Sequence, residues 1–324
     1  MSKAKTIALG LLILLLIALP WLVNPYVLQI VISTITYSIL GLAFAFTLRV
    51  GLPRFDIAAW WAIGAYTTTT LMLKTHMSFW LTLPIAGLVA VILGWLFFVI
   101  VIPRGMMVFL MFGMVLTLAT QQFFGAMKFF GAWGGTGVVP QPTIGPFTFA
   151  NKPELYFLGL ILLLINLLVY YALFNSKIGR AWNAIGSSLK LANSVGVDIV
   201  KYRMANVLIG NFFLAIAGSY LVAYTLVAVP TTFSFMFSVY VMMYVVVGGL
   251  AYSLTGPLIG STVITFLPEY LRVAKEYETI ITGVATILII IFMPMGILGL
   301  INLRIKPWFV RRKEYGRLSG GANK

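Results

Sequence analysis

The chain has 324 residues, of which 61% are hydrophobic and only 9% are charged. A soluble domain carries about 25% charged residues, so this chain has too few to cover a water-facing surface. The composition therefore predicts an all-α, polytopic membrane protein, and no alternating ten-residue pattern supports a membrane β-barrel. Cysteine is absent, which excludes disulfides, iron–sulfur ligation and a thiol nucleophile.

Uncharged runs predict about ten membrane-spanning helices, because each span needs roughly 20 apolar residues. Residues 6–48 hold two of them, separated by Pro20, Asn24 and Pro25. The first resembles the apolar core of a signal peptide, but no small-residue cleavage site follows, so we expect it to remain as a span. The other spans are predicted at residues 57–73, 80–102, 106–127, 155–174, three within 204–268, and 279–300, with a Gly/Pro-rich loop at 131–153.

The long uncharged run at residues 204–268 is predicted to break near Pro230 and again at residues 254–257. Around the second break lie small residues and one proline: Gly248, Gly249, Gly256, Pro257 and Gly260. Such a cluster is typical of a broken or re-entrant helix, which survives at membrane depth only under cover of protein or water. Close helix packing is the alternative reading of the same glycines.

The basic residues predict the orientation of the spans, because cytoplasmic loops collect Lys and Arg. With a cytoplasmic N-terminus, only Lys74, Lys128, Lys152, Arg272 and Lys275 of the 22 basic residues fall outside, and the others, Arg54 among them, fall inside. We therefore expect a multi-pass protein of the cell (inner) membrane with both termini cytoplasmic. Residues 1–303 form its membrane domain, and the basic tail at 304–324 can contact anionic lipid. The +15 net charge is then no sign of nucleic-acid binding.

No constellation of an enzyme or a metal site is visible. The single histidine, His76, has no second ligand nearby, and nucleophile-elbow, H-E-x-x-H and P-loop motifs are absent. We predict no catalytic residue, no metal and no cofactor bound by this chain.

None of the seven acidic residues falls in the middle of a predicted span. Glu269 comes nearest, and Arg272 three residues later predicts an ordinary ion pair on the helix surface. Ion-coupled carriers usually keep an ionisable residue inside the membrane. The charge-poor interior therefore favours transport driven from outside the membrane domain.

Residues 176–203 form a polar, basic segment between two apolar runs and are longer than a tight turn requires. Apolar residues at helical spacings predict an amphipathic helix there: Ile178, Ala181, Trp182, Ile185, Leu189 and Ala192. Asp198 is placed to cap a following helix. The segment either docks into a groove of a partner protein or lies on the membrane surface, and we favour docking.

Several stretches carry a family pattern: SKIGRAWNAI and ANSVGVDIVKYR in the polar segment, MYVVVGGLAYSLTGPLIGSTVITFLPEYLR, and FMPMGILGL. The first half adds G-A-Y-T at residues 64–67, Arg104-Gly105, and G-G-T-G at residues 134–137. On these residues the chain resembles the permease subunits of branched-chain amino-acid ABC importers (Liv type, LivM-like).

The resemblance implies that residues 176–203 are the ATPase-coupling loop of a permease domain at residues 1–303. We assign to this loop Gly179, Arg180, Ala181, Ala184, Ile185, Gly186, Leu189, Gly196, Tyr202 and Arg203. Weaker candidates for the translocation pathway are Gly64, Tyr66, Thr67, Tyr244, Gly248, Gly249, Tyr252, Ser253, Gly256 and Pro257. For any one aromatic residue among them, a place in the interfacial belt is the alternative.

Two departures from the family pattern leave questions open. Where the family usually shows G-Q-L-S-L-G-H-A-A-F-F, this chain has Arg54, Asp56 and Ile57 in place of the serine, glycine and histidine. These changes bear on the substrate and on local gating. Ser187 and Ser188 stand where acidic or amide residues are common.

What the resemblance implies is a permease subunit, not itself an enzyme, that translocates branched-chain or similar small amino acids. Its partners would be a second permease subunit, usually a related one forming a heterodimer, two cytoplasmic ATPases that bind ATP and Mg²⁺, an external solute-binding protein, and membrane lipid. Three alternatives stay open: a permease of this type for another small polar solute such as an amide or urea, a stand-alone secondary transporter or channel, and a membrane-embedded enzyme.

Overall fold

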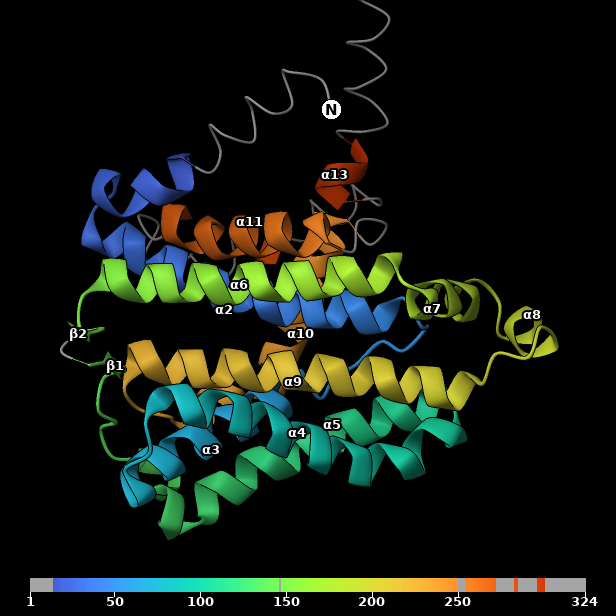
Figure 1. Cartoon of the computed structure of the whole chain (residues 1–324), viewed down its shortest axis with the longest axis horizontal. Helices are drawn as coiled ribbons and strands as arrows, with labels where there is room; N and C mark the ends of the chain where they lie inside the picture. Colours follow the sequence, from blue (N-terminus) through green and yellow to red (C-terminus); the bar gives the residue numbers. More distant parts are fainter. Residues whose placement is uncertain (1–13, 146, 250–253, 272–282, 285–295, 301–324) are drawn as a thin grey trace, which may run out of the picture.

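The computed structural model describes residues 14–145, 147–249, 254–271, 283–284 and 296–300 of the chain. Long helices lie side by side, with two short helices, α7 and α8, at one end and a small hairpin, β1–β2, at the other (Figure 1). In chain order the elements are α2 (Pro25–Leu48), α3 (Ile57–Thr75), α4 (Phe79–Val101), η1 (Ile102–Arg104), α5 (Met106–Ala126), η2 (Lys128–Phe130), η3 (Ala132–Gly134), β1 (Thr143–Ile144), β2 (Phe147–Thr148), α6 (Lys152–Asn175), α7 (Lys177–Ser187), α8 (Leu189–Ser194), α9 (Ile199–Thr225), η4 (Pro230–Phe233), α10 (Phe235–Gly248), α11 (Thr255–Leu271) and α13 (Gly296–Leu300).

The helices begin at residues that can satisfy a helix N-terminus. Pro25 opens α2, where its missing N–H is not needed. At α6, Asn151 and Glu154 form a reciprocal capping box, with the Asn151 N–H donating to Glu154 Oε2 at 3.1 Å. Asp198 accepts from the Lys201 N–H at 3.0 Å, which confirms the predicted cap of the helix after the polar segment.

Helix α9 is the central element of the bundle and packs against α2, α3 and α4. Its approach to α3 is close because glycine stands at both crossing points. A Cβ added to Gly64 would lie 2.1 Å from the Ala215 carbonyl oxygen, and one added to Gly218 would lie 2.1 Å from the Trp61 carbonyl oxygen. The two backbones therefore touch directly, as small residues allow in membrane bundles.

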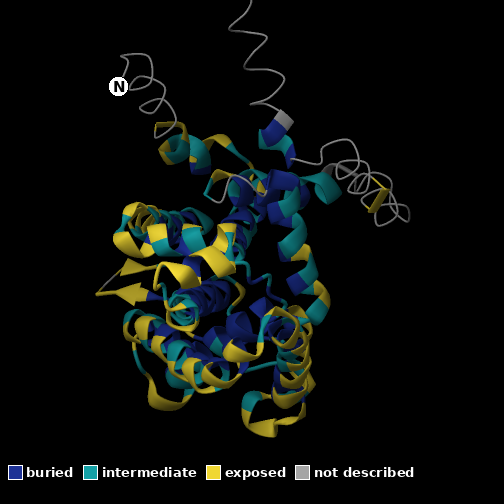
Figure 2. Cartoon of the chain, turned by 90° about the vertical axis from the view of Figure 1, so that its right-hand side faces the viewer, coloured by how far each residue is buried: buried dark blue, intermediate teal, exposed yellow. Residues whose placement is uncertain are grey.

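The outward faces of α4, α5 and α6 are apolar and exposed, whereas buried residues gather in the middle of the molecule (Figure 2). Exposed side chains include Leu88, Ile92 and Trp95 on α4 and Ile161 and Leu168 on α6. An apolar surface of this extent marks contact with lipid or with another protein. Within the described residues five helices are long and apolar enough to cross a membrane: Pro25–Leu48, Phe79–Arg104, Met106–Ala126, Lys152–Asn175 and Ile199–Thr225.

The chain is thus a helical membrane protein, and its described helices match the predicted spans closely. The helix predicted at residues 57–73 is α3, and those predicted at 80–102, 106–127 and 155–174 are α4, α5 and α6. The total of ten spans and the orientation of the termini stay predictions. Most of the predicted last span, and the whole tail at 304–324, lie outside the described residues.

The run at residues 204–268 is broken twice, once near Pro230 as predicted and once just before the predicted residues 254–257, of which residues 255–257 already belong to α11. Helix α9 ends at Leu226, which is left-handed with φ +60°, and α10 follows the short η4 turn. Helix α10 ends at Gly249, with φ +119°, and α11 begins at Thr255. A Cβ on Gly248 would lie 1.8 Å from the Gly256 carbonyl oxygen, so α10 and α11 meet backbone to backbone beside the break.

The loop predicted at residues 131–153 is anchored to the connection between α9 and α10. The Thr136 N–H donates to the Ala228 carbonyl oxygen at 3.0 Å and the Val139 N–H to the Leu226 carbonyl oxygen at 2.8 Å. The Ala228 N–H in turn donates to Thr136 Oγ1 at 3.0 Å. Two segments far apart in sequence are thereby joined at the hairpin end of the bundle.

The substitution Gly64→Ala tests the close contact of α3 with α9. The added methyl group would overlap the α9 backbone, so we expect the free energy of unfolding to fall by about 1–3 kcal/mol. Thermal unfolding of the purified protein in detergent, followed by tryptophan fluorescence, measures the change. Gly134→Ala is the matched control, since no atom lies within 4 Å of its added Cβ. Equal stability of the two variants would contradict the packing described.

Candidate functional site

The first part of the polar segment at residues 176–203 folds as two short helices, α7 and α8, rather than as the single amphipathic helix predicted, and residues 199–203 already belong to α9. Ser176 caps α7 by accepting from the Gly179 N–H at 3.2 Å. Ser188 ends α7 and caps α8 by accepting from the Leu191 N–H at 3.3 Å. Ser187 bonds back to the Asn183 carbonyl oxygen at 2.8 Å. The unexplained serine pair thus marks the joint between the two helices.

The apolar face of α7 is held against the bundle. Trp182 and Ile185 are fully buried, and the Trp182 indole N–H donates to the Tyr202 carbonyl oxygen at 2.8 Å. Its ring meets Phe46 of α2 edge-on at 4.9 Å between centroids. A Cβ on Gly179 would lie 2.4 Å from the Leu173 carbonyl oxygen, so α7 also abuts the end of α6. The position of α7 is therefore fixed by α2, α6 and α9 together.

Polar contacts join α7 and α9 to the end of α2. Arg49 Nη1 donates to Asn183 Oδ1 at 3.1 Å, and its guanidinium lies 4.1 Å from the ring centre of Phe174. Partial burial lowers the pKa of the Arg49 guanidinium from its ordinary value. Arg203 Nε donates to the Val50 carbonyl oxygen at 3.0 Å. These contacts join α7 and the start of α9 to the residues that follow α2.

The predicted coupling residues divide between those that fix the segment and those that face outward. Gly179, Ile185 and Arg203 are buried, Ala181, Ala184 and Tyr202 are half-buried, and Arg180, Leu189 and Gly196 are exposed. Gly186 is also exposed, but a Cβ added to it would lie 2.0 Å from the Arg49 carbonyl oxygen, so it belongs with the residues that fix the segment. Apolar side chains on and beside α8 extend the exposed group: Leu191 is 65% exposed and Val195 68%. Neither Leu191 nor Val195 was predicted from the sequence as a site residue. Such residues on a basic segment at the end of the bundle form a surface suited to another protein.

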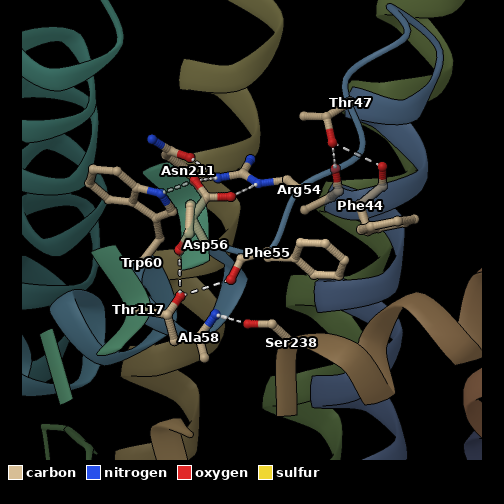
Figure 3. Close-up of polar contacts among 12 residues, drawn as sticks. Phe44, Thr47, Arg54, Phe55, Asp56, Ala58, Trp60, Thr117, Asn211 and Ser238 are labelled. Carbon is tan, nitrogen blue, oxygen red and sulfur yellow. Dashed lines mark hydrogen bonds and ion pairs between the residues drawn. The ribbon is translucent and has the colours of Figure 1, made fainter. Parts of the chain in front are cut away.

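After α2 the chain turns back into the bundle, and there it carries a buried ion pair (Figure 3). Arg54 and Asp56 are both fully buried. Arg54 Nε donates to Asp56 Oδ1 at 2.8 Å and its Nη2 donates to Oδ2 at 2.7 Å. Two sequence predictions are therefore wrong: Arg54 does not lie on the inner surface, and the interior does contain ionisable groups. The pair is neutral as a whole, which is how such groups are accommodated there.

Neighbouring helices donate to and accept from this pair, although Arg54 Nη1 has no hydrogen-bond partner among the described residues. Asn211, midway along α9, accepts from Arg54 Nη2 at 2.6 Å, and the Trp60 indole donates to Asp56 Oδ2 at 2.6 Å. Thr117, midway along α5, donates to the Phe55 carbonyl oxygen at 2.8 Å. Helix α3 therefore starts inside the bundle, not at its end. The sequence signal for these buried contacts was the presence of polar residues, Thr117 and Asn211, within the apolar runs of α5 and α9.

The predicted pathway residues do not come together at one place. Gly64 lies in the tight contact of α3 with α9. Tyr66 and Thr67 line a cavity of about 610 Å³ between α3, α4 and α5, whose walls are mostly Phe and Leu with a few Thr. Such a lining offers little to a charged or polar solute. Tyr244 lies apart from these, stacked on Tyr37 of α2 at 5.8 Å.

The remaining pathway candidates gather at the break between α10 and α11. Gly248, Gly249 and Gly256 lie in close backbone contact there, and a Cβ on Gly41 of α2 would lie 3.2 Å from Pro257 Cβ. Tyr252 and Ser253 lie outside the described residues. The cluster therefore shows both of its readings, a break between α10 and α11 and close backbone packing of the glycines beside it.

Sequence reasoning missed a polar pocket between α2 and α11, with a volume of about 220 Å³. It is lined by Tyr26, Gln29, Ile30, Ser33, Tyr37, Thr265 and Glu269. The polar residues of α2 recur every three or four positions, a spacing that the sequence displays but that its apolar surroundings obscure. Among the described residues no group of three or more His, Asp or Glu side chains could hold a metal ion.

Comparison with known families matches residues 26–293 to the family described as "Branched-chain amino acid transport system / permease component". The chain is 28% identical to the high-affinity branched-chain amino acid transport system permease protein LivM of Escherichia coli (strain K12), over 94% of this chain and 77% of that protein. It is 24% identical to the probable branched-chain amino acid transport permease protein LivH of Methanocaldococcus jannaschii, over 80% of this chain and 87% of that protein. No solved structure matches the chain.

Breaking the buried ion pair tests its contribution to stability. Asp56→Asn leaves a buried, unpaired guanidinium, and Arg54→Gln leaves a buried, unpaired carboxylate. We expect each change to lower the free energy of unfolding by about 3–5 kcal/mol, and the double variant to regain part of that loss. Thermal unfolding in detergent measures all three. Arg104→Gln, at an exposed position, serves as control. Simple additivity of the single effects would contradict the pairing.

Proposed function

This chain belongs to the family of permease components of branched-chain amino acid transport systems, and we propose that it is the transmembrane permease subunit of an ATP-driven importer. In this proposal a second, related permease subunit completes the core. Two separate ATPase subunits bind ATP and Mg²⁺ on the cytoplasmic side, and an external solute-binding protein delivers the amino acid. The chain itself is not an enzyme. The observation that carries the proposal is the pair of helices α7 and α8, anchored to the bundle on one face and exposed on the other.

Helices α7 and α8 have the properties required of a docking site for a motor subunit. Trp182 and Ile185 fix α7 to the bundle. A movement of α7 would therefore be passed to the helices against which it packs. Leu191 and Val195 present apolar contact area, and the same segment carries the exposed basic residues Arg180 and Lys190. Interfaces of this kind combine a small apolar centre with a polar rim.

A continuous series of contacts runs from α7 to the centre of the bundle. Asn183 holds Arg49, and residues 50–53 lead directly to the ion pair of Arg54 and Asp56, which is bonded to α9 through Asn211. We infer that ATP-driven movement of the ATPases displaces α7, that residues 49–56 carry this movement inward, and that α3 and α9 shift together. The core would alternate in this way between inward- and outward-facing states.

The carried solute is proposed to be a branched-chain or similar small amino acid, as the names of the relatives indicate for those proteins. The residues Arg54 and Asp56 depart from the family pattern, which kept an amide or urea open as the solute. Their complete burial among α3, α5 and α9 supports a role in packing rather than in contact with the solute. The departure therefore gives no reason to favour the alternative.

Docking is tested at the exposed apolar residues of α8. Leu191→Asp and Val195→Asp place a charge in the proposed interface, so we expect the amount of ATPase that co-purifies with the permease to fall at least tenfold. The measurement is affinity purification of this chain expressed with its ATPase subunits. Val138→Asp is the matched control, because Val138 is 70% exposed at the hairpin end. Undiminished ATPase in both α8 variants would refute the docking surface.

Coupling is tested inside α7. Ala184→Pro removes a hydrogen bond and kinks the helix, so we expect the ATPases to hydrolyse ATP while amino-acid uptake falls at least tenfold. Uptake and hydrolysis are measured side by side in proteoliposomes that contain the whole transporter. Ala205→Ser, at a half-buried position in α9, is the control for any loss of activity that expression, purification and reconstitution of a variant would cause by themselves. Loss of membrane insertion, or uptake at the wild-type rate, would contradict a coupling role.

A further inference from the structure

An apolar groove lies between α4 and α5 and opens on the surface of the bundle. It is the cavity of about 610 Å³ whose walls include Tyr66 and Thr67. Helix α3 packs against both α4 and α5, whereas these two helices make few contacts with each other, so α3 forms the floor of the groove. Ala119 and Phe123 of α5 line the groove and are exposed. The cavity is therefore accessible from the side of the bundle.

The surface on both sides of this groove is apolar. Leu88 and Ile92 are exposed on α4, and Val115 and Leu118 are exposed on α5. A protein interface usually surrounds its apolar centre with a polar rim, and α4 and α5 have no charged residue to form one. Both helices are long and apolar enough to cross a membrane, and such uncharged faces are in contact with hydrocarbon. The groove therefore opens toward the acyl chains of the bilayer.

The depth of the groove matches one leaflet of a membrane. On α5 its lining runs from Phe124, near the hairpin end of the bundle, to Leu116. Leu116 lies about 15 Å along the helix from Ala126, the last residue of α5. The hydrocarbon core of a bilayer is about 30 Å thick, so the groove extends from the hairpin end to near the middle of the membrane. One acyl chain of a phospholipid has this reach.

A second cavity, of about 290 Å³, adjoins the groove at the hairpin end. Thr70, Phe129 and Phe130 line both cavities, so the two lie next to each other. The second cavity is also lined by Lys74, in the last turn of α3, and by Lys128, which follows α5 directly. Lys74 Nζ lies 5.4 Å from the centre of the Phe129 ring. This lysine pocket thus places two cations at the entrance of the apolar groove.

The positive charge of the lysine pocket is not balanced by the residues around it. Among the described residues that line the pocket there is no carboxylate, and neither lysine forms an ion pair in the described part of the chain. Lys74 and Lys128 are also two of the five basic residues that the sequence places on the outer side, where basic residues are few. Two like charges in one pocket are stabilised by an anion, and lysine commonly binds phosphate.

We propose that the groove and the lysine pocket together bind one anionic phospholipid of the outer leaflet, with an acyl chain between α4 and α5 and the phosphate between Lys74 and Lys128. Basic pockets between membrane helices bind lipid headgroups in this manner. The acyl chain fills the space that α4 and α5 leave open beside α3. It packs on a different face of α3 from the one that Gly64 presents to α9, so the lipid completes the packing around α3.

Lipid binding to the purified full chain tests the headgroup half of the site. The probes are dioleoylphosphatidylglycerol, an anionic phospholipid, and dioleoylphosphatidylcholine, which has the same acyl chains and no net charge. Native mass spectrometry gives the dissociation constant of the first lipid bound. We expect the anionic lipid to bind at least tenfold more tightly, and the double variant Lys74→Gln, Lys128→Gln to lose this preference. Lys152→Gln is the matched control, because Lys152 lies at the same end of the bundle and does not line the pocket.

Filling the groove tests the acyl-chain half separately. Ala119→Trp places an indole ring in the groove from α5, and Val89→Trp does so from α4. We expect each change to weaken binding of the anionic lipid at least tenfold although both lysines are present. Leu118→Trp and Leu88→Trp are the matched controls, because these neighbours are exposed and do not line the groove. Thermal unfolding in detergent shows which variants fold, and one folded groove variant is enough for the test.

Several results would overturn the proposal. The first two are a wild-type chain that does not prefer the anionic lipid and a preference that survives in the lysine double variant. A third is unchanged lipid affinity in the folded groove variants. Equally tight binding of glycerol phosphate, which has the headgroup chemistry without acyl chains, would indicate a site for a free phosphate instead. Loss of a second permease subunit, rather than of lipid, from the purified Ala119→Trp variant would assign the groove to a protein interface.

Discussion

The buried pair of Arg54 and Asp56 is the interaction on which the arrangement of the bundle depends. It lets the chain turn back after α2 and start α3 inside the protein, a path that an unpaired charge would forbid. Two charges without water are stabilised when further hydrogen bonds serve their remaining donors and acceptors. Asn211 and Trp60 supply two such bonds, whereas Arg54 Nη1 has none among the described residues. Because Asn211 comes from α9, the pair also fixes the depth at which α3 and α9 face each other.

Helix α2 runs from the polar pocket beside α11 to the docking helices α7 and α8. Near its end, Phe46 packs on Trp182 of α7. Near its start, Tyr26 contacts Glu269 of α11. Between them, Gly41 lies against Pro257 at the break that separates α10 from α11. A movement at the docking helices can therefore reach the polar pocket along one rigid element, which is the kind of physical connection that coupling between distant sites requires.

The sequence predicted those features that follow from apolar run length and from helix caps. The start of α3 at Ile57, the breaks around Pro230 and Gly249, and the cap at Asp198 all depend on local chemistry. Arg54 and Asp56 were misplaced because charges beside a proline between two spans ordinarily face water. Their partner Asn211 is more than 150 residues away, so only the fold brings them together.

The candidate site, too, could be predicted only where a local sequence pattern determines the structure. Helical spacing placed Trp182 and Ile185 on one apolar face, which we expected to dock into a partner or to lie on the membrane. That face packs against the chain's own bundle instead. That spacing continues through Leu189 and Ala192, so it hid the joint that Ser188 creates. The pocket at Glu269 needs the register between α2 and α11, which no local pattern contains.

The central position of α9 also governs the order in which the protein can be made. Helices α2 to α5 leave the ribosome long before α9, yet Gly64 packs on Ala215 and Arg54 needs Asn211. Until α9 is inserted, the first half of the bundle lacks its inner wall, and its ion pair lacks one of its hydrogen-bond partners. Packing of the early helices must therefore wait for the second half of the chain. A premature stop before residue 199 would leave an unfinished bundle for the membrane's quality-control proteases.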